Sequence, residues 1–117
     1  MTIQEMAKTI ANARRTGVQC DVDWPEGVET LADAQSVQAQ VVDAFDPNKL
    51  GWKVGATNDG AQKAFGLNTP FYGPMCEASW TENDSEITKT DTVLAVEPEF
   101  AFKMARDFPA NGEVVTA

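Results

Sequence analysis

The sequence predicts an α+β protein in which a helix-rich N-terminal region leads into the start of a β-sheet. Apolar residues follow helical spacing in two stretches within the first 45 residues. Alternating apolar side chains, typical of strands, gather after residue 90. With 117 residues the chain has the usual size of one domain. We therefore expect a single domain over 1–117, with a helix-rich front over 1–90 and the first strands of a larger sheet over 91–117.

Both expected helices are bounded by residues that usually start or stop a helix. The first lies within 2–17, where Gly17 supplies a C-terminal stop. The second begins with Thr30 as N-cap and Asp33 three residues later, and it ends ahead of Pro47. Each helix has an apolar face, which predicts that it packs against another element.

Shorter elements are expected between the helices and the later strands. The stretch "GWKVGATN" is typical of a short strand between two glycines, Gly51 and Gly55. The next stretch, "NDGAQKAFGLN", predicts a short helix with an Asn or Asp cap. The stretch "TPFYGPM" predicts an aromatic turn, because its two prolines and its glycine are turn-forming residues.

The stretch "VLAVEPEFAFKMARDF" places two carboxylates inside a run of apolar, strand-forming side chains. Side chains two positions apart on a strand point the same way, so Glu97 and Glu99 share one face. The opposite face carries Phe100 and Phe102, which we expect to face a core. Two like charges this close are unfavourable unless a cation neutralises them. The pair is therefore either a solvated strand face or part of a metal site.

The chain contains no histidine, which limits the chemistry that it can perform. Ser-His-Asp and Cys-His catalysis and imidazole-based zinc sites are excluded within this chain. Oxygen ligands would favour Mg²⁺, Mn²⁺ or Ca²⁺ at the Glu97 and Glu99 pair. Lys53, between the two glycines of "GWKVG", is either a surface lysine or an ammonium offered to an anionic group.

The composition narrows the classes of partner and the location. A net charge of −9 without a cluster of Lys and Arg argues against a nucleic-acid partner. No apolar run reaches the length of a membrane span, and the N-terminus lacks a signal-peptide core, so we expect a cytoplasmic protein and no membrane partner. Cys20 and Cys76 are expected to be free thiols in that compartment.

Three stretches carry a family resemblance: "GWKVGATN", "AQKAFGLNTPFYGPM" and "EPEFAFKMARDFP". In order and spacing they resemble the 2-keto-4-pentenoate hydratase branch of the fumarylacetoacetate hydrolase superfamily, and "ANARRTG" and "DAQSVQAQVVDAF" are similar to that family too. The resemblance covers nearly the whole chain but only about the first half of a typical member. It implies the start of that family's mixed β-sheet roll, with the rest of the sheet and a third carboxylate ligand beyond residue 117.

The resemblance also implies a function. It assigns Glu97 and Glu99 as the first two ligands of Mg²⁺ or Mn²⁺, and Lys53 as a catalytic lysine that binds a substrate carboxylate or assists proton transfer. The implied substrates are 2-oxo-4-enoic or 2-hydroxydienoic acids from aromatic-ring degradation, and the implied enzyme is a hydratase. Family members usually assemble as oligomers, so a homo-oligomer, or association with a chain that completes the fold, is expected.

One departure from the family keeps other functions open. Hydratases of this kind often carry an acidic residue in the turn that corresponds to "TPFYG", where this chain has Phe71 followed by Tyr72. An acid–base role at that position is therefore not carried over to this chain. The alternatives are a 2-oxo acid decarboxylase, a C–C bond hydrolase, or a non-catalytic truncated relic that acts as a binding module.

Overall fold

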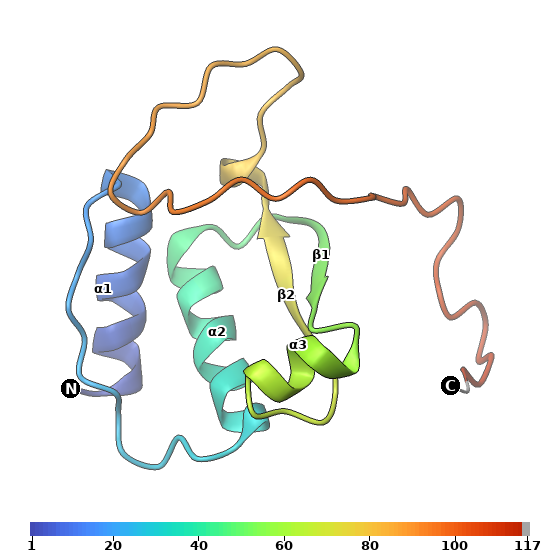
Figure 1. Ribbon diagram of the computed structural model, residues 1–117, viewed down its shortest axis with the longest axis horizontal. Coiled ribbons are helices and arrows are strands. Elements are labelled where there is room, and N and C mark those ends of the chain that lie inside the picture. The colour runs from blue at the N-terminus through green and yellow to red at the C-terminus, as the bar shows by residue number, and fades with distance from the viewer. Residues whose placement is uncertain (116–117) are drawn as a thin grey trace.

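The structure, a computed structural model, describes residues 1–115. It is a mixed α+β fold, as the sequence predicts at this level, in which two long helices lie side by side and a β-hairpin lies next to the second (Figure 1). The elements in chain order are α1 (Ile3–Thr16), α2 (Leu31–Phe45), β1 (Lys49–Gly55), α3 (Asp59–Ala64), β2 (Phe71–Cys76) and a 3-10 turn, η1 (Glu77–Ser79). No helix within residues 1–115 is long and apolar enough to cross a membrane.

Both long helices start at reciprocal caps. The Thr30 hydroxyl accepts a hydrogen bond from the Asp33 backbone N–H at 3.2 Å, and the Asp33 carboxylate accepts one from the Thr30 backbone N–H at 2.9 Å. Thr2 and Glu5 form the same box at the start of α1. These contacts satisfy N–H groups that a helix leaves free at its first turn, which confirms the predicted start of α2.

The core lies between α1 and α2. Met6 and Ala7 of α1 are buried against Val37 and Val41 of α2. Ala11 of α1 is buried as well, and partly buried Ile and Val side chains pack against the cluster. Most of the buried apolar side chains among the described residues lie on these two helices.

One carboxylate connects the end of α2 to both ends of the hairpin. Asp46 is buried, and its Oδ1 accepts a hydrogen bond from the Asn48 backbone N–H at 2.9 Å, ahead of β1. Its Oδ2 accepts one from the Ala78 backbone N–H at 2.8 Å, just after β2. The N–H of Ala78 first, and that of Asn48 second, hold the pKa of the Asp46 carboxyl below its usual range. The guanidinium of Arg15 adds a hydrogen bond from α1 to the Phe45 carbonyl at 2.9 Å.

The hairpin differs from the sequence prediction in its second strand. β1 was expected, but "TPFYGPM" forms β2 instead of a turn and pairs antiparallel with β1, with Lys53 opposite Gly73 and Trp52 opposite Pro74. Pro74 is tolerated because each strand has only one neighbour among residues 1–115, so both are edge strands, where a missing N–H need not break a ladder. Pairing with β1 overrides the local turn signal.

No strand forms over residues 91–115, in contrast to the predicted first strands over 91–117, of which 116–117 lie outside the described residues. Phe100 and Phe102, expected to face a core, are 97% and 87% exposed. The alternation of "VLAVEPEFAF" favours an extended backbone, but a strand also needs a neighbour to share hydrogen bonds. β1 and β2 pair with each other, and no other strand lies within the described chain.

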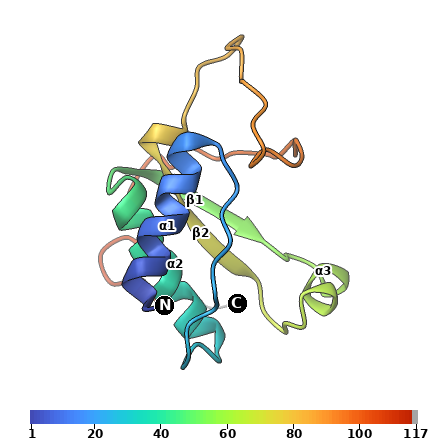
Figure 2. The same ribbon diagram turned by 90° about the vertical axis from the view of Figure 1, so that its left-hand side faces the viewer.

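Residues 90–100, which we call the strap, run from the end of α1 across α2 and the hairpin (Figures 1 and 2). At the α1 end, Gly17 has a φ of 69°, and a Cβ there would lie 2.6 Å from Thr90 Cγ2. Only glycine fits this combination of a left-handed conformation and a close approach. The Gln19 side chain donates a hydrogen bond to the Asp91 carbonyl at 3.2 Å, which completes this attachment.

The helix–helix core can be tested by truncating one methionine. We expect Met6→Ala to lower the free energy of unfolding by about 2–5 kcal/mol, because it leaves a cavity between α1 and α2. Met104→Ala is the matched control, since Met6 is fully buried while Met104 is 61% exposed. The control should change the unfolding free energy by less than about 0.5 kcal/mol in urea titration. Equal losses for the two variants would contradict the assignment of the core.

The Asp46 junction predicts a dependence of stability on pH. Because folding lowers the pKa of this carboxyl, Asp46 stabilises the fold above its unfolded pKa, near 3.8, and that contribution is lost as pH falls through the lower folded value. Urea midpoints measured down through this range should fall less steeply for Asp46→Asn than for the wild type. The exposed Asp21→Asn variant should keep the wild-type slope, and a wild-type slope in Asp46→Asn would contradict the prediction.

Candidate metal and substrate site

β1 presents Lys53 on the face of the hairpin that is turned toward α2. Lys53 pairs with Gly73, and cross-strand partners share a face. A Cβ at Gly73 would lie 2.8 Å from Nε2 of Gln38, so α2 approaches the hairpin closely on this face. The absence of a side chain at Gly73 therefore leaves the space beside Lys53 to the helix and to the strap.

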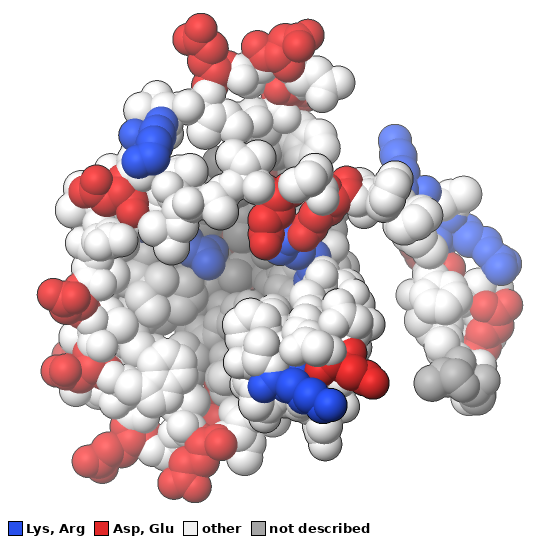
Figure 3. Space-filling view, viewed as in Figure 1, with Lys and Arg blue, Asp and Glu red and all other residues white. Residues whose placement is uncertain are grey.

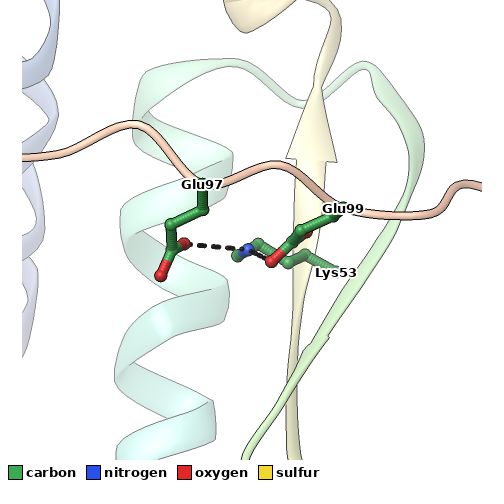
Figure 4. Close-up of polar contacts among 3 residues, drawn as sticks. All are labelled: Lys53, Glu97 and Glu99. Carbon is green, nitrogen blue, oxygen red and sulfur yellow. Dashed lines mark hydrogen bonds and ion pairs between the residues drawn. The ribbon is translucent and has the colours of Figure 1, made fainter.

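The strap brings Glu97 and Glu99 to Lys53 (Figure 4). The Lys53 Nζ lies 3.3 Å from Glu97 Oε2, and it also donates a hydrogen bond to Glu99 Oε1. These ion pairs join residues 44 and 46 positions apart in the sequence. The three residues singled out in the sequence thus meet at one atom, and the two carboxylates share one side of an extended backbone, as predicted, even without a sheet.

The electrostatics of this cluster favour a charged Lys53. The hydrogen bond that Lys53 donates to Glu99 raises the pKa of the Lys53 ammonium most; partial burial opposes this rise, and the hydrogen bond donated to Glu97 adds to it. Lys53 in this arrangement is therefore an ammonium that cannot act as a general base near neutral pH. In the space-filling view, acidic side chains lie over a basic one near the middle of this face (Figure 3).

The cluster lies in an open setting. The side chains of Lys53, Glu97 and Glu99 are 47%, 69% and 50% exposed. A cavity of about 180 Å³ lies elsewhere, near the end of β2, and none of the three residues lines it. Its lining includes Arg14, a cation that sequence reasoning did not single out, although "ANARRTG" contains the only Arg pair.

The donor set fits a hard divalent ion in part. Carboxylate oxygens are ligands that Mg²⁺ and Mn²⁺ prefer, and Mg²⁺ is commonly held by one or two carboxylates with water and substrate completing its shell. The Lys53 ammonium shows that Glu97 and Glu99 converge on one positively charged group. Within residues 1–115, no third Asp, Glu, Cys or His gathers with them. Two protein ligands are thus available here, and the others would be oxygens of water or substrate.

The aromatic residues of β2 take no part in the cluster. Phe71 stands at the position where hydratases of the resembled family often carry an acidic residue. Its ring packs edge-on against Phe65, with ring centroids 5.5 Å apart. Tyr72 packs edge-on against Trp52 at 5.5 Å. Because Tyr72 neighbours Gly73 in the strand, it points to the face opposite Lys53. The single phenol of the chain therefore lies away from the candidate site.

The comparisons with known proteins do not assign a function to the cluster of Lys53, Glu97 and Glu99. No family model, curated protein or solved structure matches the chain. The resemblance carried by "GWKVG" and "EPEFAF" therefore stays a prediction from the sequence.

The contact between Lys53 and the strap can be tested by proteolysis. Within residues 1–115, the two ion pairs to Lys53 are the only hydrogen bonds or ion pairs that link residues 94–115 to the helices and the hairpin. We expect Glu97→Gln/Glu99→Gln to speed trypsin cleavage after Lys103 roughly two- to fivefold, because exposed ion pairs are individually weak.

The matched control is Glu82→Gln/Glu86→Gln, which removes the same charge from the exposed loop ahead of the strap. It should leave the cleavage rate unchanged. Added salt should move the wild type toward the strap variant, since salt screens exposed charges. A cleavage rate that is the same in all three proteins would contradict the tethering role of Lys53.

Proposed function

We propose that this chain belongs to a divalent-metal-dependent hydratase, a hydro-lyase that acts on a 2-oxo-4-enoic or 2-hydroxydienoic acid of aromatic-compound catabolism. The observation that carries the proposal is the meeting of Lys53, Glu97 and Glu99 at one point. Two carboxylates and a lysine are the groups that a metal-bound oxo acid needs. The resemblance of three stretches to 2-keto-4-pentenoate hydratases supports the substrate class.

Each residue has a chemical task in this proposal. Glu97 and Glu99 would hold Mg²⁺ or Mn²⁺ through their carboxylate oxygens. When bound, the ion would polarise the keto oxygen of the substrate and stabilise the negative charge that develops there. Lys53, once free of the carboxylates, binds the substrate carboxylate as an ammonium or passes a proton to the substrate. The net reaction adds one water across the substrate's carbon–carbon double bond.

A related reaction of the same site is the second candidate. Phe71, packed on Phe65, leaves no acid at the position where hydratases of this kind often carry one. This favours a 2-oxo acid decarboxylase or a C–C bond hydrolase, which would use the same metal and the same Lys53 on a different bond. Product analysis distinguishes them, because a decarboxylase releases CO₂, whereas a C–C bond hydrolase consumes one water and gives a carboxylic acid from the acyl side and a ketone from the carbon that takes the proton.

The open setting also supports two proposals about partners. Both hairpin strands are edge strands among residues 1–115, and Phe100 and Phe102 are exposed. A second copy in a homo-oligomer, or another chain that completes the fold, would cover the free strand edges and the two exposed phenylalanines. If neither forms, the alternative is a non-catalytic module that binds a small acid or a partner. The free thiols of Cys20 and Cys76 are consistent with the proposed cytoplasmic location.

The proposal predicts metal-dependent turnover by the full chain. We expect Mn²⁺ to bind in calorimetry, and a 2-hydroxydienoic acid to lose its ultraviolet absorbance only when Mn²⁺ or Mg²⁺ is present. Glu97→Gln and Glu99→Gln should each weaken Mn²⁺ binding by about tenfold or more, since each removes a charged ligand. Chelation should stop the reaction.

Glu113→Gln is the control for charge, because its carboxylate pairs with Arg106 at 4.0 Å and not with Lys53. It should bind Mn²⁺ as the wild type does. Turnover that survives chelation, or Mn²⁺ binding that is unchanged in both strap variants, would overturn the proposed metal enzyme. Mn²⁺ binding without turnover of any 2-oxo acid would favour the binding module.

A further inference from the structure

Lys53 fills the position between the two carboxylates that a metal ion would take. Its Nζ contacts oxygens of both Glu97 and Glu99, and its side chain is half exposed. Mg²⁺ binds carboxylate oxygens at about 2.0–2.1 Å, which leaves no room for an ammonium between the ion and the same oxygens. Lys53 and a divalent ion are therefore competitors for one place.

We propose that Lys53 is a built-in counter-ion that a divalent metal ion displaces, and that only the displaced ammonium is available to an anionic substrate. This inference rests on the metal site proposed above and adds an order of events to it. Metal enters first, Lys53 leaves the carboxylates, and the acid binds afterwards.

The charge of the cluster supports this order. Two carboxylates and one ammonium carry a net charge of −1, which repels an organic acid. A divalent ion raises the net charge to +1, and the same acid is then attracted. The flexible four-carbon stem of Lys53 can turn toward solvent without moving β1. A single binding event thus converts a surface that disfavours acids into one that binds them.

No other cation in residues 1–115 competes for these carboxylates. Lys49, on the same strand, pairs with Asp43 at 3.8 Å, and Arg106 pairs with Glu113 at 4.0 Å. Neither contacts Glu97 or Glu99. Lys49 is also 41% exposed in its side chain, close to the 47% of Lys53, so it offers a matched control for the same substitution.

The test measures Mn²⁺ binding by calorimetry to the 117-residue wild type, Lys53→Met and Lys49→Met. Removal of the competitor should tighten Mn²⁺ binding roughly tenfold in Lys53→Met, because two half-exposed ion pairs and one like charge are removed. Lys49→Met should bind as the wild type does. Adding Glu99→Gln to Lys53→Met should abolish the gain. Lys53→Gln, which keeps a polar end, replaces Lys53→Met if circular dichroism shows that the latter is unfolded.

Pyruvate, a simple 2-oxo acid, probes the second half of the inference. The wild type should bind pyruvate only when Mn²⁺ is present, and the Mn²⁺-loaded Lys53→Met should bind it more weakly than the loaded wild type. Pyruvate binding without Mn²⁺, or equal binding by the two loaded proteins, would overturn the role of the freed ammonium.

The outcomes separate this inference from the proposed function. Equal or weaker Mn²⁺ binding by Lys53→Met, together with a loss in Glu99→Gln, would overturn the competition and leave the metal site standing. An absence of Mn²⁺ binding in both the wild type and Lys53→Met would overturn the metal site and the competition together. Mn²⁺ binding by Lys53→Met but not by the wild type would support the competition, because Lys53 would then exclude the ion completely.

Discussion

The position of the hairpin depends on one buried carboxylate, that of Asp46. Its two oxygens accept hydrogen bonds from the backbone at the start of β1 and just after β2, so the hairpin is held closed at the end next to α2. The Arg15 guanidinium ties α1 to the same place. Lys53 is presented from the hairpin, and the strap is held by Lys53. The position of Lys53, Glu97 and Glu99 therefore depends on Asp46, which lies outside the candidate site.

The sequence predicts those parts of the fold that local chemistry decides. The start of α2 is encoded by Thr30 and Asp33, which meet within one turn. β2 was missed because Gly73 and Pro74 favour a turn in isolation, and only pairing with β1 reveals the strand. The strand over 93–108 has the right alternation but no neighbour among the described residues, and pairing is a property that alternation alone does not encode.

In the candidate site, too, the local geometry was predictable from the sequence and the long-range contact was not. A shared side for Glu97 and Glu99 follows from any extended backbone, so it was predictable although the sheet was not. Their contact with Lys53 joins distant parts of the chain, so the residues alone left open a solvated face or a metal site, and the resemblance implied a metal ion and not the Lys53 ammonium beside them. A pair of like charges signals that a cation is needed, but it does not specify which one. The same two carboxylates accept either.

The two attachments of the strap differ in kind. At Gly17 the strap is held by a close backbone fit, which salt does not screen, and at Lys53 it is held by exposed charges, which salt does screen. Loss of the ionic end leaves the strap anchored at Thr90, a few residues from Glu97. Its carboxylates then remain near Lys53 at an effective concentration on the order of millimolar. Rebinding is therefore an intramolecular event, and an ion from solution competes against a ligand that never diffuses away.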